Sequence, residues 1–290
     1  MTLKKMKKKI LKTVKNIYHL FKRFDSDSRY FDRIREMIPE LQKYKYDQKD
    51  YFIERAQEEG LNTLKEYHFF LKGHPEKVEQ LRKHLTYSGS HFFRGEDWTF
   101  FTERVLSQFR NRKNVRVWCA GCSTGQEVYS LIMSLLNYVS LDAIDLLASD
   151  YNDELLDICK KGNYAIMHYH EIPEEYQKYT TVIKNRFVFA EELRKIIKTD
   201  NINLLTDDYP EGFDIILCRN VIKFFLPSLR LNVQKKFASS LNDGGILFLS
   251  YDDGNDDEMI EDPGKLGFRQ ISDRGIYQKA TTADRRNRKK

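Results

Sequence analysis

Short apolar runs alternate with helical stretches from residue 115 onward. Each run has the six or seven positions typical of a buried strand. The expected strands are Val115–Ala120, Ala143–Ser149, Phe213–Cys218 and Gly245–Ser250. Amphipathic spacing predicts helices between them over 126–138, 153–161 and 228–241. Alternation of this kind predicts a doubly wound α/β sheet.

Two further stretches complete this domain, which we expect over residues 87–280. The segment 163–200 interrupts the alternation with a polar, tyrosine-rich sequence, which predicts an inserted subdomain. Gly264–Gln270 and Arg274–Lys279 predict a closing pair of strands.

The chain before residue 87 has a helical pattern instead. Apolar residues recur every three or four positions over 25–86, where Gly60 and Gly73 act as stop signals. This predicts a small helical domain. Residues 1–24 show the same spacing with lysines in between, which predicts a basic amphipathic arm, and residues 281–290 form a basic tail.

The net charge of +6 comes from the two ends. Residues 1–23 hold nine Lys and Arg without an acidic residue, and 284–290 add a net four, which leaves about −7 for residues 24–283. Nucleic-acid enzymes usually carry a basic stripe on the folded body, so a nucleic-acid partner is not expected. The arm suits an anionic membrane or an acidic partner, and also a helix whose lysines simply face water.

The segment 115–127 runs from an expected strand through a turn with Gly121 and Gly125 into a helix. Small residues there let backbone N–H groups approach a ligand at the carboxyl end of the strand. The next strand ends near Asp150, which is placed either to accept hydrogen bonds from ribose hydroxyls or to cap a helix.

The four cysteines do not predict a metal site. Cys119 and Cys122 form a C-x-x-C pair, but no second C-x-x-C or C-x-x-H pair accompanies them. Four cysteines in a chain of this length, without an apolar stretch of membrane-spanning length or a secretory signal, predict a reduced, cytoplasmic protein.

Several strings in this order carry a resemblance to a known family. They are T-Y-S-G-S-H-F-F-R from Thr86 to Arg94, W-C-A-G-C-S-T-G-Q-E-V-Y-S from Trp118, A-S-D ending at Asp150, N-L-L from Asn203, and F-D-I-I-L-C-R-N-V from Phe213. Together they resemble the CheR family of chemoreceptor glutamate methyltransferases. The resemblance implies a small helical N-terminal domain followed by a Rossmann-like S-adenosylmethionine-dependent methyltransferase sheet, with 163–200 as an inserted small β-subdomain.

The resemblance also assigns site residues by position. It implies that the cofactor, S-adenosylmethionine or its product S-adenosylhomocysteine, is bound by Ser88, Ser90, Arg94, Gly121, Glu127, Asp150, Asn203 and Arg219. Glu127 would contact its amino-acid end and Asp150 its ribose. Arg94 would also hold the incoming carboxylate, and Phe224 stands where the family has a tyrosine near the methyl group. The implied partner is the cytoplasmic helical bundle of a chemoreceptor, which places the protein peripherally at receptor-bearing membranes.

Two departures from the family keep an alternative open. Phe224 lacks the tyrosine hydroxyl, and residues 51–59, which correspond to a basic receptor-binding helix of the family, hold one arginine and three glutamates. The alternative is a CheR-like protein that binds S-adenosylmethionine or S-adenosylhomocysteine with weak or no receptor methylation, and that acts as an interaction module or on another acceptor.

Overall fold

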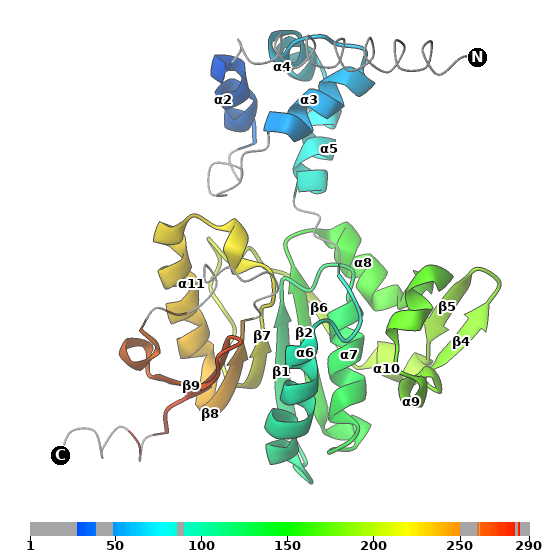
Figure 1. Ribbon diagram of the computed structural model, residues 1–290, viewed down its shortest axis with the longest axis vertical. Helices are drawn as coiled ribbons and strands as arrows, with labels where there is room; N and C mark the ends of the chain where they lie inside the picture. Colours follow the sequence, from blue (N-terminus) through cyan, green and yellow to red (C-terminus); the bar gives the residue numbers. More distant parts are fainter. Residues whose placement is uncertain are drawn as a thin grey trace, which may run out of the picture. The chain divides into compact units, whose positions relative to one another are not determined.

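The structure is a computed structural model that describes residues 28–38, 49–85, 90–249, 260, 262–281 and 284 (Figure 1). The chain divides into two compact units, Met1–Thr86 and Tyr87–Lys290. The expected arm 1–24 lies outside the described residues, as does the tail 281–290 apart from Thr281 and Asp284. Among the described helices, none has both the length and the apolar character needed to cross a membrane.

The described part of the first unit is helical. Its elements are α2 (Ser28–Glu36), α3 (Lys49–Glu58), α4 (Leu64–Gly73) and α5 (Pro75–Leu85). Their apolar faces meet in one core, which contains Ile34, Phe52, Leu64 and Leu71. Thr63 starts α4 because its hydroxyl accepts a hydrogen bond from the Glu66 N–H at 3.1 Å.

The second unit is built on a mostly parallel sheet, as the sequence predicts. Its strands are β1 (Val115–Ala120), β2 (Ile144–Asp150), β6 (Ile197–Asn201), β7 (Phe213–Leu217), β8 (Leu241–Phe248), β9 (Phe268–Ser272) and β10 (Ile276–Lys279). In the described residues their order is β6-β2-β1-β7-β8-β10-β9, with β10 antiparallel to both of its neighbours. The chain passes from β1 outward to β2 and β6 and returns to β7 on the other side of β1. The switch point therefore lies between β1 and β7, where α/β sheets bind ligands.

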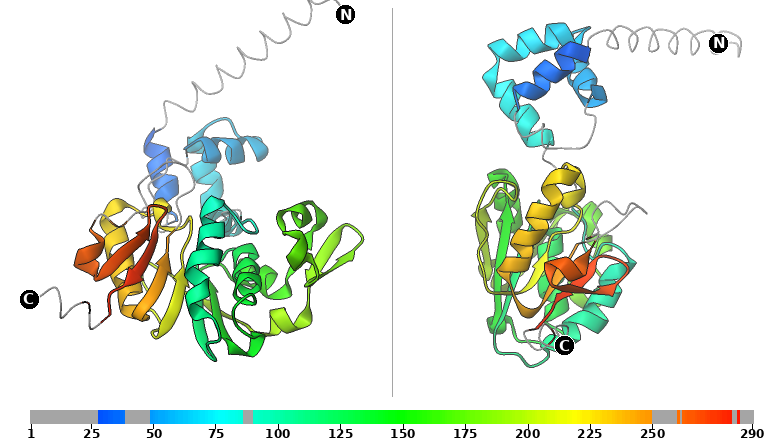
Figure 2. Two further views of the ribbon diagram at one scale, coloured as in Figure 1. Left: turned by 60° about the horizontal axis from the view of Figure 1, so that its bottom comes forward. Right: turned by 90° about the vertical axis from the view of Figure 1, so that its left-hand side faces the viewer.

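A second, smaller sheet lies near the β6 edge, opposite the flank that carries β9 (Figures 1 and 2). It has the order β3-β5-β4, from β3 (Asn163–Ala165), β4 (Thr180–Ile183) and β5 (Arg186–Phe189). The short helices η5 (Ile166–Glu171), α9 (Glu174–Gln177) and α10 (Glu191–Lys195) accompany it. We call residues 163–195 the insert. Residues 197–200, at the end of the range expected for the subdomain, belong to β6 of the main sheet.

Some element ends differ from the expectation for local reasons. β8 starts at Leu241, which pairs with Phe213 across a shift in register. The segment Pro263–Leu266 is the 3-10 helix η8 rather than the start of a strand, since Asp262 caps it and Gly267 ends it with φ +76°. β9 therefore begins only at Phe268.

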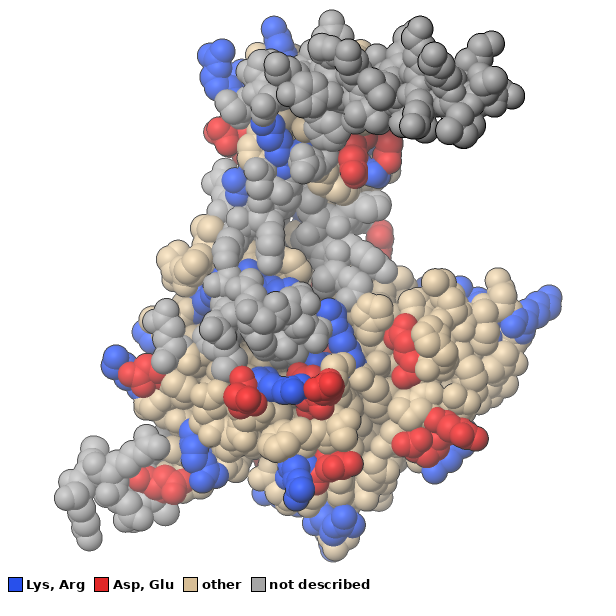
Figure 3. Space-filling model, in the orientation of Figure 1, with Lys and Arg blue, Asp and Glu red and all other residues tan. Residues whose placement is uncertain are grey.

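The described surface of the second unit mixes charges of both signs. On the face seen in Figure 3, Lys and Arg lie among Asp and Glu rather than in a single basic stripe. Several of these side chains are paired locally. For example, Asp145 accepts hydrogen bonds from Lys198 Nζ at 2.6 Å and Arg116 Nε at 3.2 Å.

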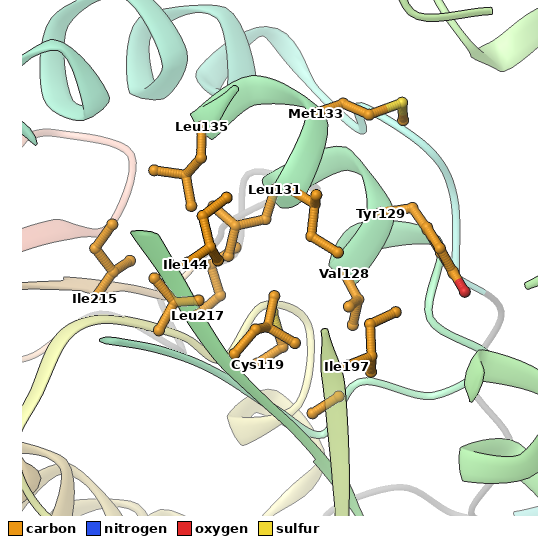
Figure 4. Close-up of a cluster of buried hydrophobic side chains, with 14 of the residues drawn as sticks. Cys119, Val128, Tyr129, Leu131, Met133, Leu135, Ile144, Ile197, Ile215 and Leu217 are labelled. Atoms are coloured by element: carbon orange, nitrogen blue, oxygen red, sulfur yellow. The ribbon is translucent and has the colours of Figure 1, made fainter. Parts of the chain in front are cut away.

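Helices cover both faces of the main sheet. On one face, α6 (Glu96–Phe100), the π-helix Phe101–Val105, α7 (Gln126–Leu135) and α8 (Asp153–Lys161) pack against the strands. Figure 4 shows side chains of α7, such as Leu131, lying over Cys119 of β1 and Leu217 of β7. On the other face, α11 (Pro227–Ser240) contributes Phe237, whose ring centroid lies 5.5 Å from that of Trp118. This packing fixes the strand ends that form the site.

Candidate active site

A pocket opens at the carboxyl ends of β1 and β7, at the switch point of the sheet. Its lining comes from the segment before α6, the turn after β1, the start of α7 and the residues after β7. The lining residues are Ser90, His91, Arg94, Cys119, Ala120, Gly121, Cys122, Ser123, Glu127, Leu217, Arg219 and Asn220. Ser90, Arg94, Gly121, Glu127 and Arg219 of the expected set are thus brought together.

The turn after β1 requires its two glycines. The N–H groups of Gly121 and Cys122 both donate to the Ser149 carbonyl, at 2.8 and 2.9 Å, which ties the turn to the end of β2. Gly121 has φ +74°, and a Cβ there would lie 2.7 Å from Val221 Cγ2. Gly125 has φ +90°, and a Cβ there would lie 2.4 Å from Cys159 Sγ. The glycines therefore meet both a backbone and a packing requirement.

Asp150 ends β2 beside this turn. Its Oδ2 accepts the Ser123 N–H at 2.8 Å and its Oδ1 accepts the Asn152 N–H at 3.0 Å. Burial raises the pKa of this carboxyl, and the hydrogen bonds from backbone N–H groups partly offset the rise. The separate cap of α8 is Asn152, whose side chain accepts the Glu154 N–H. Asp150 is thus held as an acceptor next to the pocket rather than as the cap of that helix.

Arg219 is the central cation of the site. Its fully buried side chain contacts Asp97 Oδ2 through Nη2 at 3.1 Å and Glu127 Oε2 through Nη1 at 3.3 Å. Nη2 also donates to the Arg94 carbonyl at 2.8 Å. The guanidinium lies 4.7 Å from the ring centroid of Phe248. Arg219 therefore joins the segment before α6 to the start of α7, and it fixes Glu127 at the pocket wall.

The segment from Ser90 to Arg94 forms another wall. The Phe93 N–H donates to Ser130 Oγ of α7 at 3.0 Å, and the Arg94 side chain is half-buried. Ser88, which the resemblance also assigns to cofactor binding, lies outside the described residues.

Asn220 also lines the pocket, although the sequence pattern does not predict a role for it. It has φ +57° and is 9% exposed, and its Nδ2 has no hydrogen-bond partner among the described residues. A buried amide without a partner at a pocket wall is suited to a polar ligand atom. Asn220 directly follows Arg219 in the C-R-N-V string, and this position is the sequence feature that indicates a place at the pocket.

Three expected site residues of the described chain lie outside the pocket lining: Asp150, which is held beside it, Asn203 and Phe224. The Asn203 side chain accepts the Leu205 N–H at 3.0 Å and so stabilises its own turn, although Ile202 beside it donates to the Asp150 carbonyl. Phe224 is half-buried in the 3-10 helix Ile222–Phe224. Arg230 of α11 holds this helix by donating to the Phe225 and Lys223 carbonyls at 3.0 and 3.1 Å.

The cysteines at the pocket are part of the packing. Cys119 and Cys122 are buried free thiols, and burial raises the pKa of Cys119. A side-chain hydrogen bond with Cys159 and burial raise the pKa of Cys122. In the part of the chain that the structure describes, His, Cys, Asp and Glu side chains do not gather in a group suited to a metal ion.

These features define a class of protein. The main sheet is Rossmann-like, with an antiparallel pair of strands at one edge. Its pocket lies at the switch point, beside a glycine turn and an acidic strand end. This is the architecture of methyltransferases that depend on S-adenosylmethionine.

Comparisons with known proteins then identify the family. Residues 88–273 match the family described as CheR methyltransferase, SAM binding domain. The chain is 30% identical to a chemotaxis protein methyltransferase of Listeria monocytogenes, over 86% of this chain and 95% of that protein. The counterpart in Listeria innocua is 29% identical over the same shares, and one in Borreliella burgdorferi is 27% identical over 66% and 74%. The chain belongs to the CheR methyltransferase family.

The pocket fits the cofactor of this family, S-adenosylmethionine. Gly121 places backbone without a side chain at the pocket lining, and the buried Nδ2 of Asn220 offers a hydrogen-bond donor. Asp150 presents a carboxylate at the strand end, which suits ribose hydroxyls. Glu127 adds negative charge that suits the amino group of the cofactor.

Proposed function

We propose that this methyltransferase transfers the methyl group of S-adenosylmethionine to glutamate carboxylates on the cytoplasmic helical bundle of a chemoreceptor. The observation that carries the proposal is the gathering of Ser90, Arg94, Glu127 and Arg219, all from CheR-type strings, around one pocket. The relatives reported above are named chemotaxis protein methyltransferases, which supports a role in chemotaxis. Such a role places the protein in the cytoplasm, at the membrane that carries the receptor.

The bound cofactor supplies a methyl group on a positively charged sulfur. A glutamate side chain has an ordinary pKa of about 4.3, so it is already an anion at neutral pH and no proton has to be removed before it attacks. The work of the protein is therefore alignment and the exclusion of water.

Four polar residues in or beside the pocket have a part in this alignment. Asp150 holds the ribose, and Glu127, oriented by Arg219, holds the amino-acid end of the cofactor. The Arg94 guanidinium holds the incoming carboxylate through charge-assisted hydrogen bonds. Cys119 and Leu217 supply apolar wall that excludes water.

The test is transfer of labelled methyl groups to receptor-bearing membranes, scored as methanol released in mild base. Arg94→Ala should lower kcat/KM about ten- to hundredfold, the effect of one charge-assisted hydrogen bond. Arg104→Ala, which removes an exposed arginine from the second unit, is the matched control. The absence of base-labile label from the wild-type reaction would contradict the proposal.

A second candidate function rests on Phe224. In this alternative the protein binds S-adenosylmethionine but methylates receptors weakly or uses another acceptor, because the hydroxyl of the family's tyrosine is missing. Phe224→Tyr should then raise receptor methylation at least about tenfold, the scale of one gained hydrogen bond. The control is Phe69→Tyr at an exposed phenylalanine of the first unit. Unchanged methylation would count against this alternative.

A further inference from the structure

Glu171, the last residue of η5 in the insert, contacts the pocket wall. Its Oε2 accepts the Phe92 N–H at 2.9 Å, across 79 positions of sequence. Its Oε1 accepts a hydrogen bond from His168 Nδ1 at 2.8 Å and lies 3.4 Å from His91 Nδ1. The carboxylate, only 15% exposed, is thus shared between its own helix and the segment that lines the pocket.

The Phe92 side chain is anchored in the same insert. It is 3% exposed and packs against Tyr164 of β3 and against Phe187 and Phe189 of β5, with ring centroids 5.2, 5.9 and 5.6 Å away. Both the N–H and the ring of Phe92 are therefore held by residues of the insert.

The two residues that follow are held largely by the main domain. The Phe93 N–H donates to Ser130 of α7, and the Arg94 carbonyl accepts from Arg219 after β7. The Phe93 ring also stacks on Tyr176 of the insert at 5.0 Å between centroids. The pocket segment is therefore held partly by the insert and partly by the main domain. Glu171 is a charged group of the insert that contacts this segment.

We propose that Glu171 is a positioning residue that sets the placement of Ser90, His91 and Arg94 in the pocket wall. The proposal rests on the proposed function, in which Arg94 holds the acceptor carboxylate and Ser90 is one of the residues gathered around the pocket. It makes the insert part of the active-site framework, since the carboxylate that orders the wall belongs to the insert.

The charge of Glu171 is matched to this role. Burial alone would raise the pKa of the carboxyl, but hydrogen bonds from His168, from the Phe92 N–H and from His91 outweigh burial and lower it. These are the groups that face the carboxylate from η5 and from the pocket segment. Glu171 therefore stays ionised at neutral pH, where it accepts its hydrogen bonds at full strength.

The test compares Glu171→Ala with Glu171→Gln in the full chain. Gln keeps an oxygen that accepts the Phe92 N–H, whereas Ala leaves this N–H without an acceptor. Glu192→Ala, at an exposed carboxylate of α10, is the matched control. The first readout is the Kd of S-adenosylhomocysteine by calorimetry, and the second is amide hydrogen exchange of peptides covering residues 90–94 and β1.

We expect Glu171→Ala to weaken S-adenosylhomocysteine binding about tenfold and to speed exchange in 90–94 while β1 stays protected, with substantial recovery in Glu171→Gln. In methyl transfer, Glu171→Ala should raise the KM for S-adenosylmethionine more than it lowers kcat. Wild-type affinity and exchange in Glu171→Ala would overturn the proposal. So would equal defects in the Ala and Gln variants with β1 also deprotected, because that pattern means general unfolding. The binding readouts stand even if no receptor is methylated, which separates this proposal from the proposed function.

Discussion

Gly121 and Gly267 share nearly the same backbone angle but differ in surroundings. Their φ values are +74° and +76°, yet a Cβ at 121 would lie 2.7 Å from Val221 Cγ2, while nothing lies within 4 Å of a Cβ at 267. Gly267→Ala should therefore cost only the left-handed strain, about 1 kcal/mol. Gly121→Ala should cost about 1–3 kcal/mol more through overpacking. Urea denaturation of both variants measures the difference, and equal losses would show that packing at Gly121 does not matter.

The raised pKa of Asp150 gives opposite pH trends for folding and binding. The fold favours the protonated carboxyl of Asp150. The contribution of Asp150 to the free energy of unfolding is therefore fully present below the ordinary pKa of about 3.9, and it is lost as the pH rises through the raised pKa. Ribose hydroxyls favour the ionised form, so the affinity for S-adenosylhomocysteine should fall as the pH drops through the raised pKa. Calorimetry at a series of pH values checks this. Asp150→Asn should bind more weakly and lose this pH dependence, and an unchanged dependence would assign it to another group.

The sequence predicts the position of a single side chain when that residue directly follows a strand. Asp150 and Arg219 follow expected strands directly, so the carboxyl edge of the sheet was enough to place them near one pocket. The contact between His91 and Glu171 is not predictable from the sequence strings, because it forms only when the insert folds back across 80 positions of sequence. The resemblance also predicts pocket positions for Asp150, Asn203 and Phe224, which are not among its lining residues. Asp150 accepts backbone N–H groups beside the pocket, Asn203 stabilises its own turn, and Phe224 belongs to a 3-10 helix.

At the scale of elements, burial decides which strands a sequence reveals. β1 and β7 are almost fully buried and appear as apolar runs. β6, with the sequence I-K-T-D-N, has only Ile197 buried because it is an edge strand that pairs with β2 alone in the described sheet. Because its residues are mostly polar, the sequence pattern predicts 197–200 as part of the preceding insert instead of a strand of the main sheet. Edge strands of this kind lack the apolar run on which the prediction depends.

Arg219 links three elements, so replacing it should lower the free energy of unfolding. Arg219→Met keeps much of the side-chain volume but leaves Asp97 and Glu127 close together without their shared cation. Removing one partner from a buried ion pair costs about 3–5 kcal/mol. Arg112→Met, which breaks an exposed pair with Asp214, should cost about 0–1 kcal/mol. Urea denaturation with the two variants side by side measures both, and similar losses would contradict the central role of Arg219.

At the scale of the whole chain, positive charge is concentrated at the ends of the sequence. Residues 1–23 carry nine Lys and Arg, whereas α3, which occupies most of the stretch that corresponds to the family's basic receptor-binding helix, pairs its Arg55 with Glu58 at 2.6 Å. The arm is therefore the candidate source of attraction to an acidic receptor bundle or to anionic lipid.

Deleting residues 1–23 tests this attraction. Each basic residue near an anionic membrane contributes about 1 kcal/mol, and salt screens the interaction beyond about 10 Å at 0.1 M. The deletion should weaken sedimentation with receptor-bearing membranes at least about tenfold at low salt and much less at high salt. The Kd of S-adenosylhomocysteine should not change, because its pocket lies within the second unit. Deleting 285–290, which removes five Lys and Arg from the other end, is the matched control. Equal losses from both deletions would mean that any basic tail suffices, and unchanged sedimentation would remove the arm from receptor or membrane contact.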